Sequence, residues 1–188
     1  MAVLCGLSAT SFAAPASTVI REEQKIAVDG ILETWRLEWS EKPEQACSFD
    51  DPAWYTCPCM GFAFGETGSL SLVRTRPGKK DERLQLDRFF SMNDFAPESS
   101  AGGKGILQKW KPLDGDMDNF EKPGFSKELT KRPIVRIMQF GDYDHDGRAT
   151  EFLIQTGTLP CGKRMSMAVG VSKQMSRLTV FRSKNNPE

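Results

Sequence analysis

Apolar residues recur at every second position over several segments, and this period of two most constrains the fold. In Ile31–Trp39 every second residue is apolar except Glu33, and Met165–Val171 shows the same alternation. Successive side chains of a β-strand point to opposite faces, so both segments predict strands with one face toward a core. The polar residues between them predict a second face toward water.

A turn signal connects two further strand candidates. Ser69–Arg76 and Arg83–Leu86 flank the pair Pro77-Gly78. Proline presets the φ angle of the first central position of a type II turn, and glycine accepts the positive φ of the second. This spacing predicts a β-hairpin. Three other short runs read as strands: Ile134–Phe140, Glu151–Thr156 and Leu178–Phe181.

Helical signals are few and short. Ile106–Trp110 and Ser126–Thr130 each predict one or two turns of helix that end before Pro112 and Pro133. We therefore predict a mainly β fold, an antiparallel sandwich or a barrel-like domain, with short helices in the 90–132 region.

The first sixteen residues differ in composition from the rest. They contain no charged residue and end in Ala14-Pro15-Ala16, which matches the apolar region and A-x-A site of a cleavable signal peptide. We expect residues 1–16 to be removed, with the mature chain beginning at Ser17 or Ala14. The alternative is a buried N-terminal strand or helix. Residues 17–188 are then one domain of a secreted or periplasmic protein.

Four cysteines remain after the signal: Cys47, Cys57, Cys59 and Cys161. An even number in an oxidising compartment predicts two disulfides. Cys57 and Cys59 are too close in sequence to pair without strain, so each is expected to pair with Cys47 or Cys161. A zinc site and a redox-active pair remain as alternatives.

The charge distribution disfavours several partners. Lys plus Arg and Asp plus Glu both number 25 and are interspersed, which gives no electrostatic footprint for nucleic acid or an anionic membrane. The sequence contains no run of about 18 apolar residues, the length that would predict insertion into a membrane. The partner, an unknown macromolecule or surface, and the oligomeric state are left open.

The sharpest functional signal is the Asp-rich loop 142–151. Asp142, Asp144 and Asp146 occupy alternate positions before Gly147, so a tightly curled backbone can aim all three carboxylates inward. Ca²⁺ takes six to eight oxygen ligands. The predicted site therefore also uses the Arg148 carbonyl and then Thr150 or Glu151, with water supplying the remaining ligands.

At these residues the loop resembles the D-x-D-x-D-G calcium loops of EF-hands, dockerins and integrin-type propeller repeats. The resemblance covers about ten residues and implies Ca²⁺ as the cofactor. It departs from the EF-hand at the twelfth position, where Leu153 replaces a bidentate Glu, and in its strand-like flanks. Thr150 stands at the ninth position, which is usually acidic in propeller loops. A solvated turn is the alternative interpretation.

Other polar signals are weaker. Asp114–Asn119 repeats the alternation but has Lys122 at its ninth position, so we interpret it as a polar surface loop. His145 is the only histidine, and with no G-x-S-x-G elbow in the chain we assign no catalytic residue.

Two function classes follow. The first is an exported, Ca²⁺-stabilised domain with a binding or structural role and no enzymatic activity. The alternative is a small secreted hydrolase that uses paired carboxylates. Several aromatic residues could line a carbohydrate or peptide groove, although core packing accounts for them equally: Trp35, Trp39, Trp54, Trp110, Phe62 and Phe64.

Overall fold

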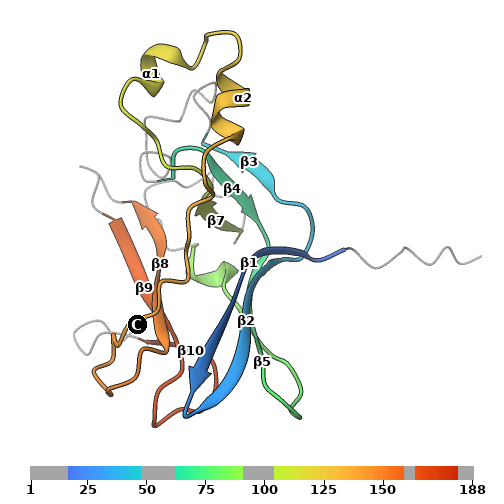
Figure 1. Ribbon diagram of the computed structural model, residues 1–188, viewed down its shortest axis with the longest axis vertical. Helices are drawn as coiled ribbons and strands as arrows, with labels where there is room; N and C mark the ends of the chain where they lie inside the picture. The colour runs from blue at the N-terminus through green and yellow to red at the C-terminus, as the bar shows by residue number, and fades with distance from the viewer. Residues whose placement is uncertain (1–16, 48–61, 91–103, 159–163, 182–188) are drawn as a thin grey trace, which may run out of the picture.

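The computed structural model describes residues 17–47, 62–90, 104–158 and 164–181. The strands of these residues form three antiparallel sheets and do not close into a barrel (Figure 1). The mainly β fold predicted from the sequence is confirmed. Within the described residues, no helix is long and apolar enough to cross a membrane.

The largest sheet has the order β1-β2-β5-β6. Its strands are β1 (Val19–Val28), β2 (Ile31–Trp39), β5 (Leu70–Thr75) and β6 (Glu82–Gln85). The predicted Pro-Gly turn joins β5 to β6: Lys79 donates its backbone N–H to the Arg76 carbonyl at 3.1 Å, and Gly78 has a φ of 67°. This geometry is that of a type II turn.

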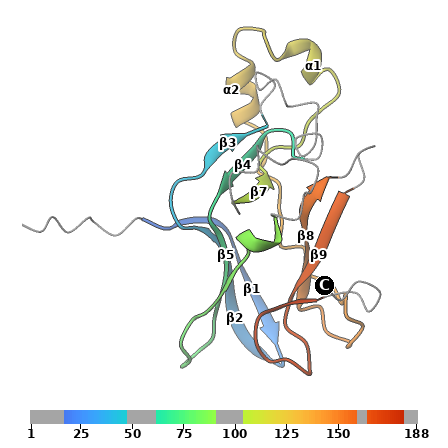
Figure 2. The same ribbon diagram turned by 180° about the vertical axis from the view of Figure 1, so that it is seen from behind.

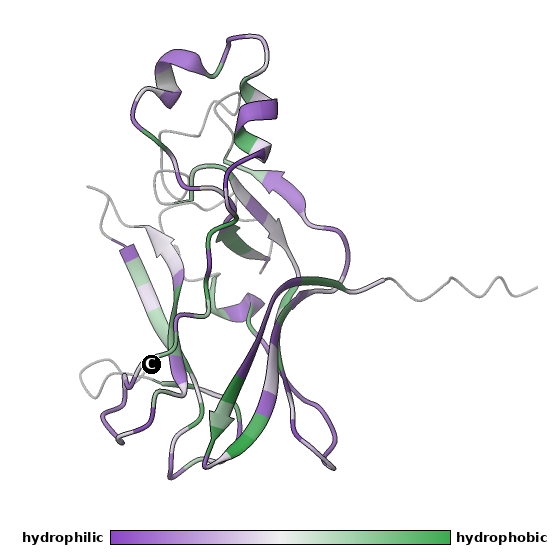
Figure 3. Ribbon diagram, in the orientation of Figure 1, coloured by the Kyte–Doolittle hydropathy of each residue, from purple (hydrophilic) through white to green (hydrophobic). Residues whose placement is uncertain are grey.

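A second hairpin joins β1 to β2. Val28 pairs with Ile31 across a two-residue loop in which Asp29 and Gly30 have φ angles of 51° and 79°. Positive φ at both positions is the type I′ turn, whose twist matches that of the flanking strands. Ile31 and Leu32 at the hairpin tip are 53% and 59% exposed and form an apolar end to the sheet (Figure 3).

The remaining strands form two three-stranded sheets. One has the order β10-β9-β8 and the other β3-β4-β7. Their bounds are β8 (Glu151–Thr158), β9 (Arg164–Gly170), β10 (Thr179–Phe181), β3 (Glu44–Ala46), β4 (Gly65–Gly68) and β7 (Gly105–Gln108). The helices are η2 (Asp87–Phe89), α1 (Asp116–Asn119) and α2 (Phe125–Thr130).

The core lies between the four-stranded sheet and the sheet of β8 and β9 (Figures 1 and 2). Trp35, Leu37 and Phe152 are fully buried there. Phe140 bridges the two sheets, with edge-to-face contacts to Trp35 at 5.4 Å and to Phe152 at 5.7 Å. Such aromatic contacts add stabilisation beyond the area that they bury.

Glu33, the polar exception on the apolar face of β2, is 3% exposed. Its carboxylate forms a two-point ion pair with Arg74 of β5, at 2.6 and 2.7 Å, and accepts a bond from the Trp35 indole at 3.0 Å. A buried charge needs such partners to offset its desolvation. Glu33 therefore interrupts the apolar alternation because its carboxylate takes part in an ion pair inside the core.

The short helices α1 and α2 occur in the predicted region and lie at one end of the molecule (Figure 1). The predicted helix at Ser126–Thr130 is confirmed as α2, but the helix predicted at Ile106–Trp110 is wrong. That segment contains β7, which pairs with β4. The Gly105 backbone approaches Leu70 so closely that an added Cβ would lie 2.8 Å from the Leu70 Cβ, which favours an extended, side-chain-free position over a helix.

The strand predicted at Ile134–Phe140 is also wrong. The segment is irregular and makes only isolated bridges, from Trp110 to Ile134 and from Gly141 to Glu151. Side chains of β1 take the place of a ladder. The Glu22 carboxylate accepts the backbone N–H of Ile137 at 2.7 Å, and Arg21 donates to the Val135 carbonyl at 2.9 Å. We call this junction of β1 with 134–140 the first seam.

A second seam joins β6 to the chain that enters β10. Leu178 donates its backbone N–H to the Glu82 carboxylate at 2.5 Å, and Arg74 donates to the Ser176 carbonyl at 2.6 Å. At both seams, hydrogen bonds between side chain and backbone take the place of a strand ladder. The three sheets therefore stay separate and do not close into a barrel.

Candidate functional site

The Asp-rich loop leaves the first seam and ends at the start of β8. Gly141 and Glu151 exchange backbone hydrogen bonds of 2.8 and 3.2 Å, which close the loop at its base. Gly170 of β9 supports this base from behind, because an added Cβ would lie 2.3 Å from the Thr150 carbonyl oxygen. The position of Glu151 is thus fixed by backbone contacts on two sides.

Hydrogen bonds inside the loop curl its backbone around the carboxylates. The two oxygens of Asp142 accept the N–H groups of Asp146 and Gly147, each at 3.0 Å. Asp144 also accepts the Asp146 N–H, at 3.1 Å. Gly147 has a φ of 85°, which glycine adopts without strain. The alternation and the glycine therefore produce the tight curl that the sequence predicted.

Three carboxylates converge in this curl. Asp142, Asp144 and Glu151 each contribute one oxygen to a group whose members all lie within 4.8 Å of one another. Oxygens bound to one Ca²⁺ at about 2.3–2.6 Å can be separated by up to about 5 Å. The spacing therefore fits a single ion held by all three groups.

Glu151 is the buried member of this group, with 0% exposure. Its carboxylate accepts the Tyr143 N–H at 3.0 Å and lies 2.7 Å from the Thr150 hydroxyl. Burial raises the pKa of Glu151 above its usual range, and the nearby charge of Asp144 acts in the same direction. A bound cation would favour the ionised form of all three groups.

The other predicted ligands occupy different positions. The carboxylate of Asp146 accepts the backbone N–H groups of Arg148 at 2.9 Å and of Lys173 at 2.7 Å. The Arg148 guanidinium reaches across to Asp29 in the β1–β2 turn, at 2.7 and 2.8 Å. The Thr150 hydroxyl lies 2.7 Å from the Val171 carbonyl as well as near Glu151.

The structure thus gathers Asp142, Asp144 and Glu151 and uses Asp146 to fasten the loop. Sequence reasoning missed Asp29 and Lys173, which hold Arg148 and Asp146. Both are distant along the chain, and no local pattern marks either residue as a partner of the loop.

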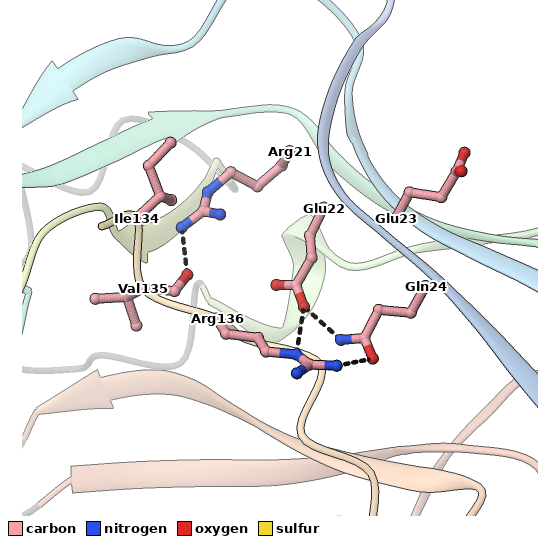
Figure 4. Close-up of a pocket in the computed structure, with 7 residues that line it drawn as sticks. All are labelled: Arg21, Glu22, Glu23, Gln24, Ile134, Val135 and Arg136. Carbon is pink, nitrogen blue, oxygen red and sulfur yellow. Dashed lines mark hydrogen bonds and ion pairs between the residues drawn. The ribbon is translucent and has the colours of Figure 1, made fainter. Parts of the chain in front are cut away.

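A shallow depression between β1 and 134–136 is the second polar site (Figure 4). Three of its polar residues, Glu22, Gln24 and Arg136, bind one another. Glu22 accepts a bond from Gln24 at 2.6 Å and lies 3.8 Å from the Arg136 guanidinium, which donates to Gln24. These groups already hold the first seam, so they are engaged in structure.

The remaining candidate residues that the structure describes do not join the carboxylates of the Asp-rich loop in a shared site. The aromatic residues Trp35, Trp39, Phe62 and Phe64 are at most 2% exposed and belong to the interior, whereas Trp54 lies outside the described residues. His145 is exposed in the loop.

Cys47 is buried beside Phe62. Cys57, Cys59 and Cys161 lie outside the described residues, so the disulfides stay a prediction.

The second acidic cluster has a structural role as well. Asp116 forms a two-point ion pair with Arg132, at 2.6 and 2.7 Å, and accepts the Leu113 N–H at 2.8 Å. The pair fastens α1 to the end of α2. Arg132 holds the pKa of Asp116 below its ordinary value through this hydrogen bond.

Comparison with known proteins gave no match to the chain among protein-family models, curated proteins or solved structures.

Proposed function

We propose that the chain is an exported, disulfide-bearing β domain whose loop 142–151 binds Ca²⁺, with a binding or structural role. The observation that carries the proposal is the convergence of Asp142 and Asp144 on Glu151 at the base of the loop. The partner is a macromolecule or surface outside the cytoplasm.

The energetic argument rests on Glu151. Three carboxylates within 4.8 Å repel one another when ionised, and Glu151 lacks solvent to screen its charge. A divalent cation removes the repulsion and offsets the desolvation of the buried group. Ca²⁺ fits better than Mg²⁺ because the loop offers several flexible oxygen ligands and Mg²⁺ prefers to keep its own water shell.

A hydrolase with paired carboxylates is the competing function. Glu151 has the raised pKa of a general acid, and Asp144 lies close enough to act with it. Glu151 is fully buried, however, so a substrate could not reach it without opening the base of the loop. This burial favours a structural cation over a catalytic pair.

Calorimetric titration of the metal-free protein with Ca²⁺ tests the proposal. We expect one binding event per chain. At a free Ca²⁺ concentration about 100 times the Kd, ligand linkage adds about 2.7 kcal/mol to the free energy of unfolding. The melting temperature should therefore rise by several degrees.

Two matched variants distinguish the loss of a ligand in the loop from the general effect of removing one negative charge. Asp144→Asn should weaken Ca²⁺ binding at least tenfold and leave the metal-free protein as stable as the parent or slightly more stable, because it relieves repulsion. Asp114→Asn removes the same charge at an exposed position of the second acidic cluster and should leave binding unchanged. If millimolar Ca²⁺ gives no heat of binding and does not raise the melting temperature, the loop is a solvated turn.

A further inference from the structure

An arginine-rich groove of about 480 Å³ runs along the second seam, between β6 and β10. Glu82, Arg83 and Leu84 line one side, and Leu178, Thr179 and Val180 line the other. Successive side chains of a strand point to opposite faces. Three consecutive residues line the groove on each side, from β6 and from Leu178 into β10, so the groove is bounded by the backbone edges of the two strands.

Both strands are at the edge of a sheet. Within residues 17–47, 62–90, 104–158 and 164–181, β6 pairs with β5 alone and β10 pairs with β9 alone. A hydrogen bond from Leu178 to Glu82 joins the two edges at the first residue of β6. An unpaired strand edge is a template for an added strand.

The two sides of the groove differ in chemistry. Leu84, Leu178 and Val180 face inward and belong to or pack against the main core. Arg83 lies on the opposite face of β6 with its side chain 51% exposed. Arg177 is also exposed and directly precedes Leu178 on the other side of the groove. An added strand would therefore meet an apolar inner side and a cationic outer side.

Cationic charge exceeds acidic charge in this groove. Its lining contains Arg83, Arg88 and Arg177 against the single acid Glu82, and Arg83 also pairs with Glu38 at 2.6 Å. Both Glu82 oxygens are engaged, one by the Leu178 N–H and the other by Arg74 and Arg76. Arg177 forms no ion pair with any residue that the structure describes.

We propose that this groove binds an extended acidic peptide segment in which apolar and acidic residues alternate. The peptide backbone pairs with the edges of β6 and β10, and its apolar side chains lie over Leu84 and Val180. Its carboxylates face the exposed Arg177, while Arg83 stays paired with Glu38. Such strand addition takes its affinity from main-chain hydrogen bonds and its specificity from alternate side chains. The site is separate from the Asp-rich loop and goes beyond the proposed cation role.

Fluorescence anisotropy with a labelled eight-residue peptide of alternating Val and Glu tests the proposal on the full mature chain. We expect saturable binding with one peptide per chain, and weaker binding as salt rises. A peptide of the same composition with its four Val and four Glu in separate blocks should bind at least tenfold more weakly. The same loss is expected when alternate amides of the first peptide are N-methylated, because its edge bonds are removed.

A pair of arginine variants locates the site. Arg177→Glu reverses an exposed charge in the groove and should raise the Kd at least tenfold, whereas Arg164→Glu makes the same change at an exposed position of β9 away from the groove and should change it less than twofold. Equal effects of the two variants would overturn the assignment. So would binding of the block peptide or the N-methylated peptide as tight as that of the alternating peptide, or binding only of a sulfated oligosaccharide.

Titrations in Ca²⁺ and in chelator keep this proposal distinct from the cation role. The peptide should bind under both conditions. Loss of Ca²⁺ binding with peptide binding retained contradicts only the cation role, and the reverse result contradicts only the groove.

Discussion

Asp116 and Asp144 stand in similar alternating clusters but meet different partners. Asp144 is in a loop closed by backbone bonds and converges on other carboxylates, whereas Asp116 finds Arg132 at the end of α2. The alternation and Gly147 were enough to predict a curled acidic loop. They could not predict that Asp146 turns to Lys173, because that contact depends on how a loop 27 residues away folds back.

The Asp116 pair predicts acid sensitivity. Its folded-state pKa is lowered from the ordinary 3.8 by the hydrogen bond from Arg132, so its stabilisation is present above about pH 4 and is lost as pH falls through the folded pKa. Asp116→Asn should lower the free energy of unfolding at pH 7 by about 1–3 kcal/mol. In urea unfolding the difference from the parent should shrink below pH 4.

Asp118→Asn is the control, since this neighbouring carboxylate is exposed. It should change stability by less than about 0.5 kcal/mol at pH 7. A difference for Asp116→Asn that persists undiminished at pH 2 would contradict the ion-pair explanation.

At the scale of elements, period-two alternation predicted strands well where one face is apolar, as in β2 and β9. It did not reveal β1, whose polar side chains bind the backbone of 134–140. The pair Asp29-Gly30 between two apolar runs was the available signal for that hairpin. The apolar run Ile134–Phe140 was misassigned because a sequence pattern does not show whether a strand partner or a side chain takes its hydrogen bonds.

The first seam should depend on one carboxylate. Glu22→Ala removes the acceptor for the N–H groups of Ile137 and Met138. Bonds to a charged acceptor contribute about 1.5–3 kcal/mol, so we expect a loss of roughly that size. Hydrogen exchange at these two amides should accelerate more than exchange at β2 amides.

Glu23→Ala is the matched control, because Glu23 is adjacent but exposed, and its side chain lies away from the others in Figure 4. Its effect on both measurements should be small. Equal effects from the two changes would show that the seam does not depend on Glu22.

At the scale of the whole molecule, the buried Arg74 connects three parts of the fold. It pairs with Glu33 of β2, approaches Glu82 of β6 at 3.4 Å and donates to the Ser176 carbonyl before β10. One side chain thus links the four-stranded sheet to the second seam. Sequence alone could not predict this, because Glu33 and Arg74 are 41 residues apart.

A double-mutant cycle should expose this role. Arg74→Met leaves Glu33 buried without its cation and should cost about 3–5 kcal/mol, measured by chemical unfolding. Adding Glu33→Leu should restore a substantial part of that loss, since the uncompensated charge is removed. Additive losses in the double variant would contradict the pairing.

The side-chain closure of the two seams has a consequence for how related chains can vary in length. One residue inserted in a laddered strand turns every following side chain to the other face. The two seams differ in this respect. Residues 173–177 are exposed and lie outside the strands, so an insertion there changes only the span that Glu82 must reach. Chains with this same core can therefore differ by single residues around 174–177, whereas 134–141 must keep its length because Met138 and Phe140 pack in the interior.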